Sequence, residues 1–157
     1  MLFINKLTLM IRKFLENNFL GFYLYFPLLL NFKDRSYIAY DEGFYALQAK
    51  WIIQTSNWIA PMWWSEAVYD RTIGIQWLIA ISQSLLGNSI WAAHIPSFIS
   101  GIITLFLTYK ISGELLGSRF SWLSPLILSI TYLWFNYFNL ATQDMPLLAL
   151  ELVGIYS

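Results

Sequence analysis

Residues 89–109 read SIWAAHIPSFISGIITLFLTY, a run of the chain that contains no charged side chain. A helix needs roughly 20 consecutive apolar residues to cross the hydrocarbon core of a bilayer, and this run is long enough. The rest of the chain has the same character, because 58% of its 157 residues are hydrophobic and only 11% are charged. Soluble domains carry about 25% charged residues, so the composition indicates a membrane protein.

Working outward from this run predicts an all-α fold of polytopic integral membrane helices, organised as one domain over residues 1–157. The expected spans are 14–32, 89–109 and 120–138, with a further span beginning at 145. Residues 110–119 are expected to form a short linker with a basic residue at each end. Because the last apolar run reaches only Ser157, we expect the chain to be the N-terminal fragment of a longer protein.

The polar stretch 33–88 separates the first two predicted spans and is expected to hold juxtamembrane helices. Phe44, Leu47, Trp51 and Ile52 recur at helical spacing, which predicts an amphipathic helix over 42–55 with Asp41 at its N-cap. Residues 73–87 are too short to span a bilayer, so an interfacial or re-entrant helix is expected there. The tryptophans between these helices, at positions 58, 63 and 64, are most simply anchors at the headgroup level, and sugar stacking is the alternative.

Charge and topology limit what the polar residues can do. The net charge of zero gives no support for a nucleic-acid partner, and the lack of cysteine excludes disulfides and thiolate chemistry. The basic residues before the first span favour a cytoplasmic N-terminus, which makes 33–88 an extracytoplasmic loop. If 73–87 does not span, Asp144 emerges on the same face as Asp41 and Glu42. Without further information, all three acids could simply cap helices, and His94, the only histidine, is predicted to be a hydrogen-bonded structural residue.

Two motifs carry a resemblance to a known family. Residues 41–46 read DEGFYA and open the juxtamembrane helix, and residues 142–146 read TQDMP and follow the third predicted span. In this order and spacing, the chain from about Tyr40 to Pro146 resembles the N-terminal part of integral-membrane glycosyltransferases with the C-type fold. Within that fold it is most similar to the glycosyltransferase family 39-like branch, which includes lipid A aminoarabinose transferases and dolichyl-phosphate-mannose protein mannosyltransferases.

The resemblance implies a hexosyl or pentosyl transferase of the bacterial plasma (inner) membrane. Its donor would be a sugar linked through phosphate to a polyprenyl lipid, and its acceptor a hydroxyl of a protein or glycan at the extracytoplasmic face, with inversion at the sugar. Asp41 would be the general base, with Glu42 beside it and Asp144 as the second acid of the site. Arg71 would contact the lipid phosphate, with Asp70 next to it.

Other readings remain at the sequence level. Asp70 and Arg71 could form a surface ion pair of little energetic value. Some relatives bind a metal near Asp70, so a divalent metal cofactor stays open and its ligands are unassigned. The fragment alone is expected to be inactive. The competing function is a small non-catalytic membrane protein, either a transporter piece or an assembly subunit.

Overall fold

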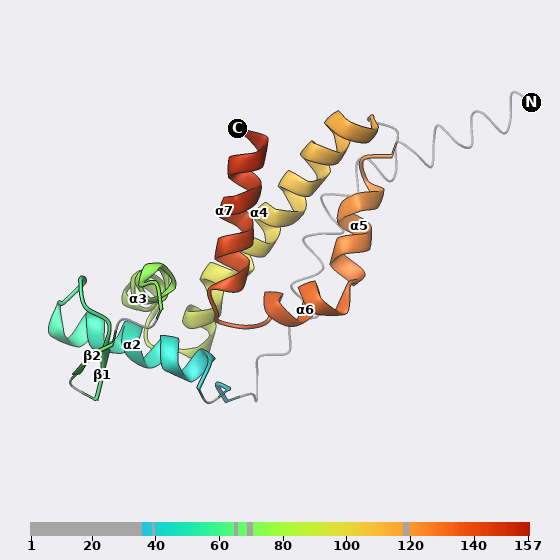
Figure 1. The fold of residues 1–157 in the computed structure, drawn as a ribbon. Helices are drawn as coiled ribbons and strands as arrows, with labels where there is room; N and C mark the ends of the chain where they lie inside the picture. Colours follow the sequence, from blue (N-terminus) through green and yellow to red (C-terminus); the bar gives the residue numbers. More distant parts are fainter. Residues whose placement is uncertain (1–35, 39, 65, 69–70, 118–119) are drawn as a thin grey trace, which may run out of the picture. The chain divides into compact units, whose positions relative to one another are not determined.

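The computed structural model describes residues 36–157 except 39, 65, 69–70 and 118–119. The predicted first span, 14–32, therefore lies outside the described residues. The all-α prediction is confirmed for the described chain, which folds into helices and one small hairpin (Figure 1). The elements are α2 (Glu42–Thr55), β1 (Met62–Trp63), β2 (Glu66–Ala67), α3 (Gly74–Leu86), α4 (Ile90–Leu116), α5 (Leu123–Ile130), α6 (Tyr132–Phe138) and α7 (Asp144–Tyr156).

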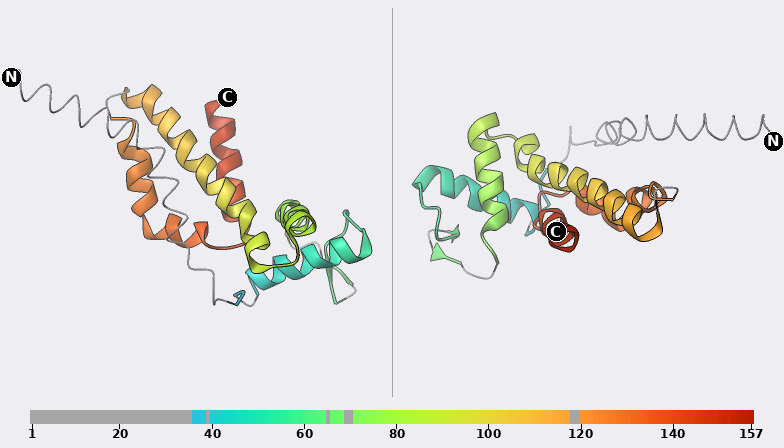
Figure 2. Two further views of the ribbon diagram at one scale, coloured as in Figure 1. Left: turned by 180° about the vertical axis from the view of Figure 1, so that it is seen from behind. Right: turned by 90° about the horizontal axis from the view of Figure 1, so that it is seen from above.

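The long helix α4 is the element against which α3, α5, α6 and α7 pack, and α7 runs along its side (Figure 2). The helix begins at Ser89, whose hydroxyl accepts the backbone N–H of Ala92 at 3.2 Å and so caps the first turn. It ends at Gly117, where a φ of 79° suits a residue without a side chain. Among the described helices, α4 alone is long and apolar enough to cross a membrane by length and composition.

The linker predicted at 110–119 is wrong over its first seven positions, because α4 continues without a break through Leu116. The apolar run ends at Tyr109, but the helix does not. Lys110, Glu114 and Leu116 have helical propensity, and an intrinsically weak residue such as Gly113 is tolerated inside a long helix. A change from apolar to charged composition marked the end of the hydrophobic stretch rather than the end of the helix.

The segment 120–138, predicted as one span, is two short helices. Thr131 takes an extended conformation between α5 and α6, and its hydroxyl donates to the carbonyl of Ile127 at 2.8 Å. Figure 1 shows α6 turning away from the direction of α5. The turn buries Trp134 and Phe138, whose rings stack at 4.7 Å, with Phe98 of α4 packing at 5.6 Å from Phe138. Packing against α4 therefore determines the break, and helix propensity does not reveal it.

The polar loop holds the two predicted juxtamembrane helices. The prediction of a helix over 42–55 is confirmed by α2, and the prediction that 73–87 is too short to span is confirmed by the 13 residues of α3. Between them the chain forms an antiparallel hairpin that pairs Met62 with Ala67, which the sequence reasoning missed. The two helices cross and bury a small apolar core, made of Tyr45, Ala49, Ile52, Ile75, Ile79, Ala80, Ala93 and Ala141.

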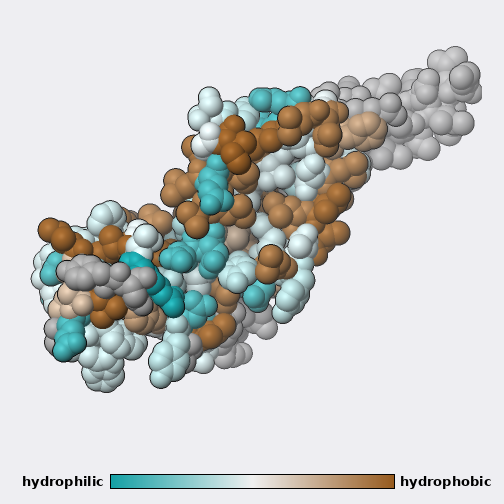
Figure 3. Space-filling view, viewed as in Figure 1, coloured by the Kyte–Doolittle hydropathy of each residue, from teal (hydrophilic) through white to brown (hydrophobic). Residues whose placement is uncertain are grey.

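Polar and apolar surfaces are unevenly distributed over the described helices. In the view of Figure 3, hydrophobic side chains cover much of the surface around α4, α5 and α7. Many of them are large and exposed, including Phe106 on α4, Ile127 on α5 and Leu150 on α7. Hydrophilic residues gather lower down, toward the start of α7 (Figure 3). This is the end of α4 to which α2 and α3 pack.

Candidate active site

The site begins at a tight turn that opens α2. Tyr40 has a φ of 63°, a left-handed conformation that is uncommon for a residue with a side chain. The backbone N–H groups of Asp41 and Gly43 both donate to the carbonyl of Ile38, at 3.4 and 3.1 Å, and so close the turn. Asp41 occupies the predicted N-cap position, but its side chain makes no capping hydrogen bond. Its carboxylate therefore makes no hydrogen bond to the first turn of α2.

The carboxylate of Asp41 faces Arg71 instead. Its Oδ1 lies 3.8 Å from Nη1 of Arg71, and the Asp41 side chain remains 42% exposed. The same Nη1 donates to the hydroxyl of Tyr45 at 2.9 Å. The guanidinium also lies over the rings of Phe44 and Tyr45, 5.3 and 5.2 Å from their centroids. These contacts hold Arg71 in one orientation through both charge and ring stacking.

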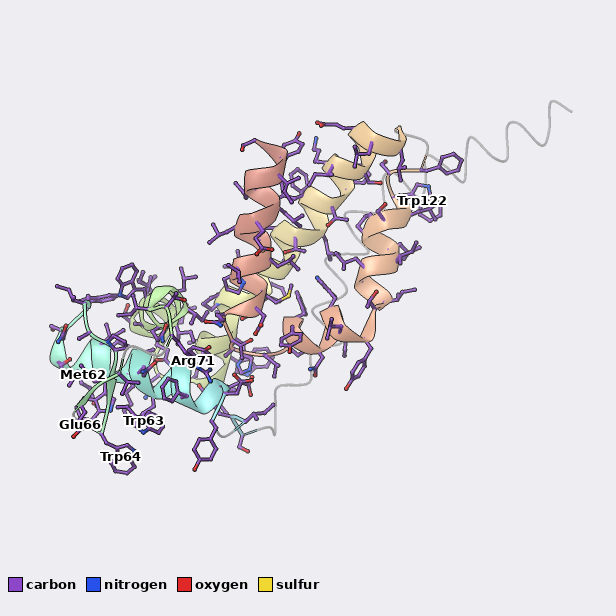
Figure 4. All side chains as sticks on the ribbon, viewed as in Figure 1. Met62, Trp63, Trp64, Glu66, Arg71 and Trp122 are labelled. Carbon is purple, nitrogen blue, oxygen red and sulfur yellow. The ribbon has the colours of Figure 1, made fainter. Side chains whose placement is uncertain are left out.

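The aromatic packing around Arg71 continues into the hairpin. Phe44 packs on Trp63 with ring centroids 4.6 Å apart, and Trp63 contacts the edge of Trp64. Figure 4 shows Arg71 close to α2, with Trp63 and Trp64 on the neighbouring hairpin. The hairpin therefore supports the arginine on the side away from α7.

Asp144 enters the site from the start of α7. Its side chain is exposed, and Oδ2 accepts the hydroxyl of Thr142 at 2.7 Å. Partial burial raises the pKa of Asp41, Arg71 acts against this increase, and the charges of Asp144 and Glu42 add to it. The charges of Asp41 and Asp144 also reach Tyr45, whose pKa is raised chiefly by burial. The structure therefore pairs Asp41 with Arg71, and the charge of Asp144 reaches Asp41 although the two residues are about a hundred positions apart in the chain.

An open groove of about 580 Å³ is lined by Arg71 and by residues of α3 and α7. Arg71, Thr72 and Gln143 supply its polar groups. The remaining lining is Gly74, Ile75, Leu78, Pro146, Leu147 and Leu150, most of them aliphatic. A groove that combines a cation with aliphatic walls has the chemistry to hold a molecule with an anionic head and a hydrocarbon tail.

Glu42 does not share the surroundings of Asp41. Its side chain is fully buried, and it accepts hydrogen bonds from the backbone N–H groups of Ile38 and Ala141, each at 3.0 Å. Nε2 of His94 lies 2.9 Å from the same carboxylate. This enclosed position suits a structural role. The expectation that Glu42 stands beside Asp41 among the catalytic residues stays a prediction.

The structure does not describe every residue predicted for the site, and it adds residues that the sequence did not indicate. Asp70 lies outside the described residues. The described part of the chain holds no cluster of three or more histidine, cysteine, aspartate or glutamate side chains that could bind a metal ion. Tyr45 was missed, although its position one helical turn after Asp41 places both residues on the same face of α2. His94 is buried and hydrogen-bonded as predicted, but nothing in the sequence connected it with Glu42.

The fold is a helix bundle in which an arginine lines a largely aliphatic groove and pairs with an aspartate. The family model of dolichyl-phosphate-mannose-protein mannosyltransferases matches residues 70–157, and the chain belongs to this family. The resemblance seen in the sequence is confirmed. The chain is accordingly an integral membrane protein.

Individual relatives are bacterial. The undecaprenyl phosphate-alpha-4-amino-4-deoxy-L-arabinose arabinosyl transferase 1 of Pseudomonas fluorescens is 27% identical over 100 residues, which are 64% of this chain and 16% of that protein. The corresponding transferase of Pseudomonas savastanoi is 30% identical over 75 residues, covering 48% of this chain and 14% of the relative. The chain thus spans about a sixth of the length of these relatives.

The fold is also known from a solved structure. The crystal structure of ArnT from Cupriavidus metallidurans bound to undecaprenyl phosphate superimposes with a TM-score of 0.79 and 18% identity. The match covers 88% of this chain and 26% of that protein. At this identity, the likeness establishes the shared helical fold.

Proposed function

We propose that this chain carries part of the active site of a glycosyltransferase that moves a sugar from a polyprenyl phosphate to an acceptor hydroxyl. The observation that carries the proposal is that Arg71 lines the largely aliphatic groove and pairs with Asp41, while Gln143 and Pro146, which flank the segment that holds Asp144, line the same groove. The names of the relatives support a donor in which the sugar is attached to undecaprenyl phosphate. The acceptor is a hydroxyl on a lipid, glycan or protein at the membrane surface.

Asp41 is the general base in this proposal. As the acceptor oxygen attacks, its proton passes to the Asp41 carboxylate, and a new bond forms between that oxygen and the anomeric carbon. The bond between the anomeric carbon and the phosphate oxygen breaks, and its electron pair leaves with the lipid phosphate. Attack from the side opposite the phosphate inverts the anomeric centre. The partial exposure of Asp41 leaves it accessible to the acceptor.

Arg71 binds the phosphate that leaves. Its guanidinium is held by Tyr45 and by the ring faces of α2, so its position is fixed before the substrate arrives. The charge that gathers on the phosphate during bond cleavage is stabilised by paired N–H donors. The aliphatic walls of the groove, including Leu78 and Leu147, take the first isoprene units of the lipid.

Asp144 is the second acid of the site and acts from the first turn of α7. Its hydrogen bond with Thr142 fixes the side chain, and its charge raises the pKa of Asp41 so that the base holds a proton more firmly after transfer. We place this site at the extracytoplasmic face of a multi-pass protein in the bacterial inner membrane, with α2 and α3 at the headgroup level. Phosphate headgroups lie at that depth.

The test is sugar transfer in membranes from cells that express the protein from its complete gene. Radiolabelled undecaprenyl-phosphate aminoarabinose is the first donor, and transfer to lipid A is measured after extraction. Asp41→Asn and Asp144→Asn should each abolish transfer while the amount of inserted protein stays constant. Gln54→Asn, an exposed change near the far end of α2, is the matched control. Full transfer by both aspartate variants would refute the assignment.

A further inference from the structure

The buried carboxylate of Glu42 connects three separate segments of the chain. Its Oε2 accepts the N–H of Ile38, which precedes the turn that presents Asp41. Its Oε1 accepts the N–H of Ala141, which lies in the loop leading to Asp144. The same Oε1 lies 2.9 Å from Nε2 of His94, in the first turns of α4. One side chain therefore joins both acid-bearing segments to the long helix.

The geometry at His94 shows that a proton lies between the two side chains. Nδ1 is 2.7 Å from the carbonyl of Ile90, and a carbonyl can only accept, so Nδ1 carries a hydrogen. The short contact between Nε2 and Oε1 then requires one more proton, either on the imidazole or on the carboxyl group. Both side chains are almost completely buried, at 4% and 0% exposure, so water does not replace either partner.

The surroundings of the pair keep it in place. The ring of Tyr37 stacks parallel to His94, with centroids 6.1 Å apart and an interplanar angle of 4°. Burial raises the pKa of Tyr37, and the charge of Glu42 adds to this increase. Because the two backbone donors and the imidazole all converge on one carboxyl group, removing the imidazole leaves that buried group with one hydrogen-bond partner fewer.

We propose that Glu42 and His94 form a positioning pair that sets the separation between Asp41 and Asp144. Asp41 directly precedes Glu42, and Asp144 follows Ala141 by three residues at the end of the α6–α7 loop, so the carboxylate of Glu42 fixes the start of α2 against the start of α7. Neither residue touches substrate. The catalytic part of this inference rests on the proposed transferase function, whereas the geometric part does not.

The decisive variants are His94→Leu and His94→Gln. The leucine side chain cannot donate to Glu42, whereas the glutamine amide can. The pair predicts that His94→Leu lowers kcat on the order of 10²-fold, because a displacement of about 1 Å is enough for such a loss. The KM for the lipid donor should stay within about twofold, because Arg71 and the groove are untouched. His94→Gln should restore most of the turnover. If His94 were merely structural, the variants would change protein yield and stability without lowering kcat at constant KM.

Ser82→Ala is the matched control. The hydroxyl of Ser82 is buried and donates to the carbonyl of Ala92 at 2.6 Å, so the variant also removes a buried hydrogen bond at the start of α4. It does not touch either acid-bearing segment. The control should lower thermal stability and leave kcat close to that of the parent. Equal losses of kcat in Ser82→Ala and His94→Leu would overturn the proposal.

A second measurement does not depend on activity. The chain has no cysteine, so spin labels attached at Tyr40→Cys and Leu147→Cys report the distance between the two acid-bearing segments. The distance distribution should be narrow in the parent and in His94→Gln, and broad or shifted in His94→Leu. An unchanged distribution in His94→Leu would overturn the positioning role.

If the parent transfers no sugar, the proposed function fails and these distances alone decide the inference. If His94→Leu does not fold, turnover and a narrow distribution in folded His94→Gln support the pair, and their loss overturns it.

Discussion

Asp41 and Glu42 are neighbours in the chain, but they lie in different environments because consecutive residues at the start of a helix point about 100° apart. Asp41 stays at the surface beside Arg71, where a substrate can reach it. Glu42 turns inward and accepts hydrogen bonds from the backbone N–H groups of Ile38 and Ala141. Two chemically similar side chains can thus have different roles: Asp41 is placed for proton transfer, and Glu42 is placed to support the surrounding backbone.

The protonation of Asp41 gives a test of the electrostatics at the site. Partial burial raises its pKa above the ordinary 3.8, so its carboxyl group should stay protonated, and reactive toward a carbodiimide, to higher pH than a free carboxyl group. Arg71→Ala removes the charge that opposes this increase, so the pH midpoint of labelling should move up. Asp144→Asn removes a neighbouring negative charge, so the midpoint should move down. Mass spectrometry of the peptide that contains Asp41 measures both, and shifts in the same direction would contradict the arrangement.

Arg71→Lys tests whether the shape of the guanidinium matters as well as its charge. Lysine keeps the positive charge but loses the planar fork that pairs with phosphate and stacks on the rings of Phe44 and Tyr45. We expect the KM for the lipid-phosphate donor to rise about tenfold, equivalent to about 1.4 kcal/mol of lost binding. Tyr45→Phe keeps the ring and removes only the hydroxyl, so it should have a smaller effect. Kinetics over a range of donor concentrations measure both variants, and an unchanged KM in Arg71→Lys would argue against phosphate binding there.

At the scale of single residues, the sequence predictions concern side chains whose charge can be recognised without knowing the fold. Asp41, Arg71 and Asp144 are charged residues beside apolar segments, and a charge in such a chain is conspicuous. The burial of Glu42 was not predictable, because its partners His94 and Ala141 are 52 and 99 residues away. Glu42 is buried and Asp41 is partly exposed only because α4 and the α6–α7 loop pack against the start of α2.

Between elements, α4 and α6 approach each other closely at Gly101. A Cβ atom at this position would overlap the ring of Phe138 and lie 3.3 Å from the end of Met145. Gly101→Ala should therefore force the helices apart and destabilise the protein by about 1–3 kcal/mol, despite the better helix propensity of alanine. At this chain length, the midpoint of thermal unfolding should fall by about 2–4 °C per kcal/mol, measured in detergent by intrinsic fluorescence.

Gly113→Ala, on the same helix, is the control for this packing argument. A Cβ atom there would meet Ser121 at 3.6 Å, which is an ordinary contact. The substitution should raise the unfolding midpoint slightly, because alanine favours a helix interior by about 1 kcal/mol over glycine. A fall of similar size in both variants would show that α4 is sensitive to any substitution, rather than to its contact with α6.

Sequence patterns within a segment predicted a helix well where that segment alone determines the helix. The apolar spacing of α2 and the short length of α3 were sufficient, because both follow from residues within the segment. The break at Thr131 and the extension of α4 to Leu116 depend on neighbours instead. Thr131 turns the chain so that two aromatic residues of α6 can pack on α4, and no local composition marks such a turn. The hairpin was missed because its strands have only two residues each.

For the whole molecule, the distribution of polarity predicts how it sits in the bilayer. Exposed apolar side chains lie along α4, α5 and α7, and others lie on α3, α6 and the hairpin loop. Asp41, Arg71 and Asp144 lie at the end of α4 where α3 packs and where Glu42 of α2 contacts His94. Lipid contact suits the first surface, and the headgroup region suits the second. We therefore expect single cysteines at Asp41 and Asp144 in intact cells to react with a membrane-impermeant maleimide.

A single cysteine at Glu114, near the other end of α4, should react only after the cells are permeabilised. The 27 residues of α4 extend about 40 Å at ~1.5 Å per residue, more than the ~30 Å hydrocarbon core, so we expect its two ends to lie on opposite sides. Residues 1–157 contain no cysteine, so within this part of the protein each label reports one position. Labelling of Asp41 and Asp144 from opposite sides would separate the two acids and remove the site. Labelling of all three positions from outside would leave the site intact and show that α4 does not cross the bilayer.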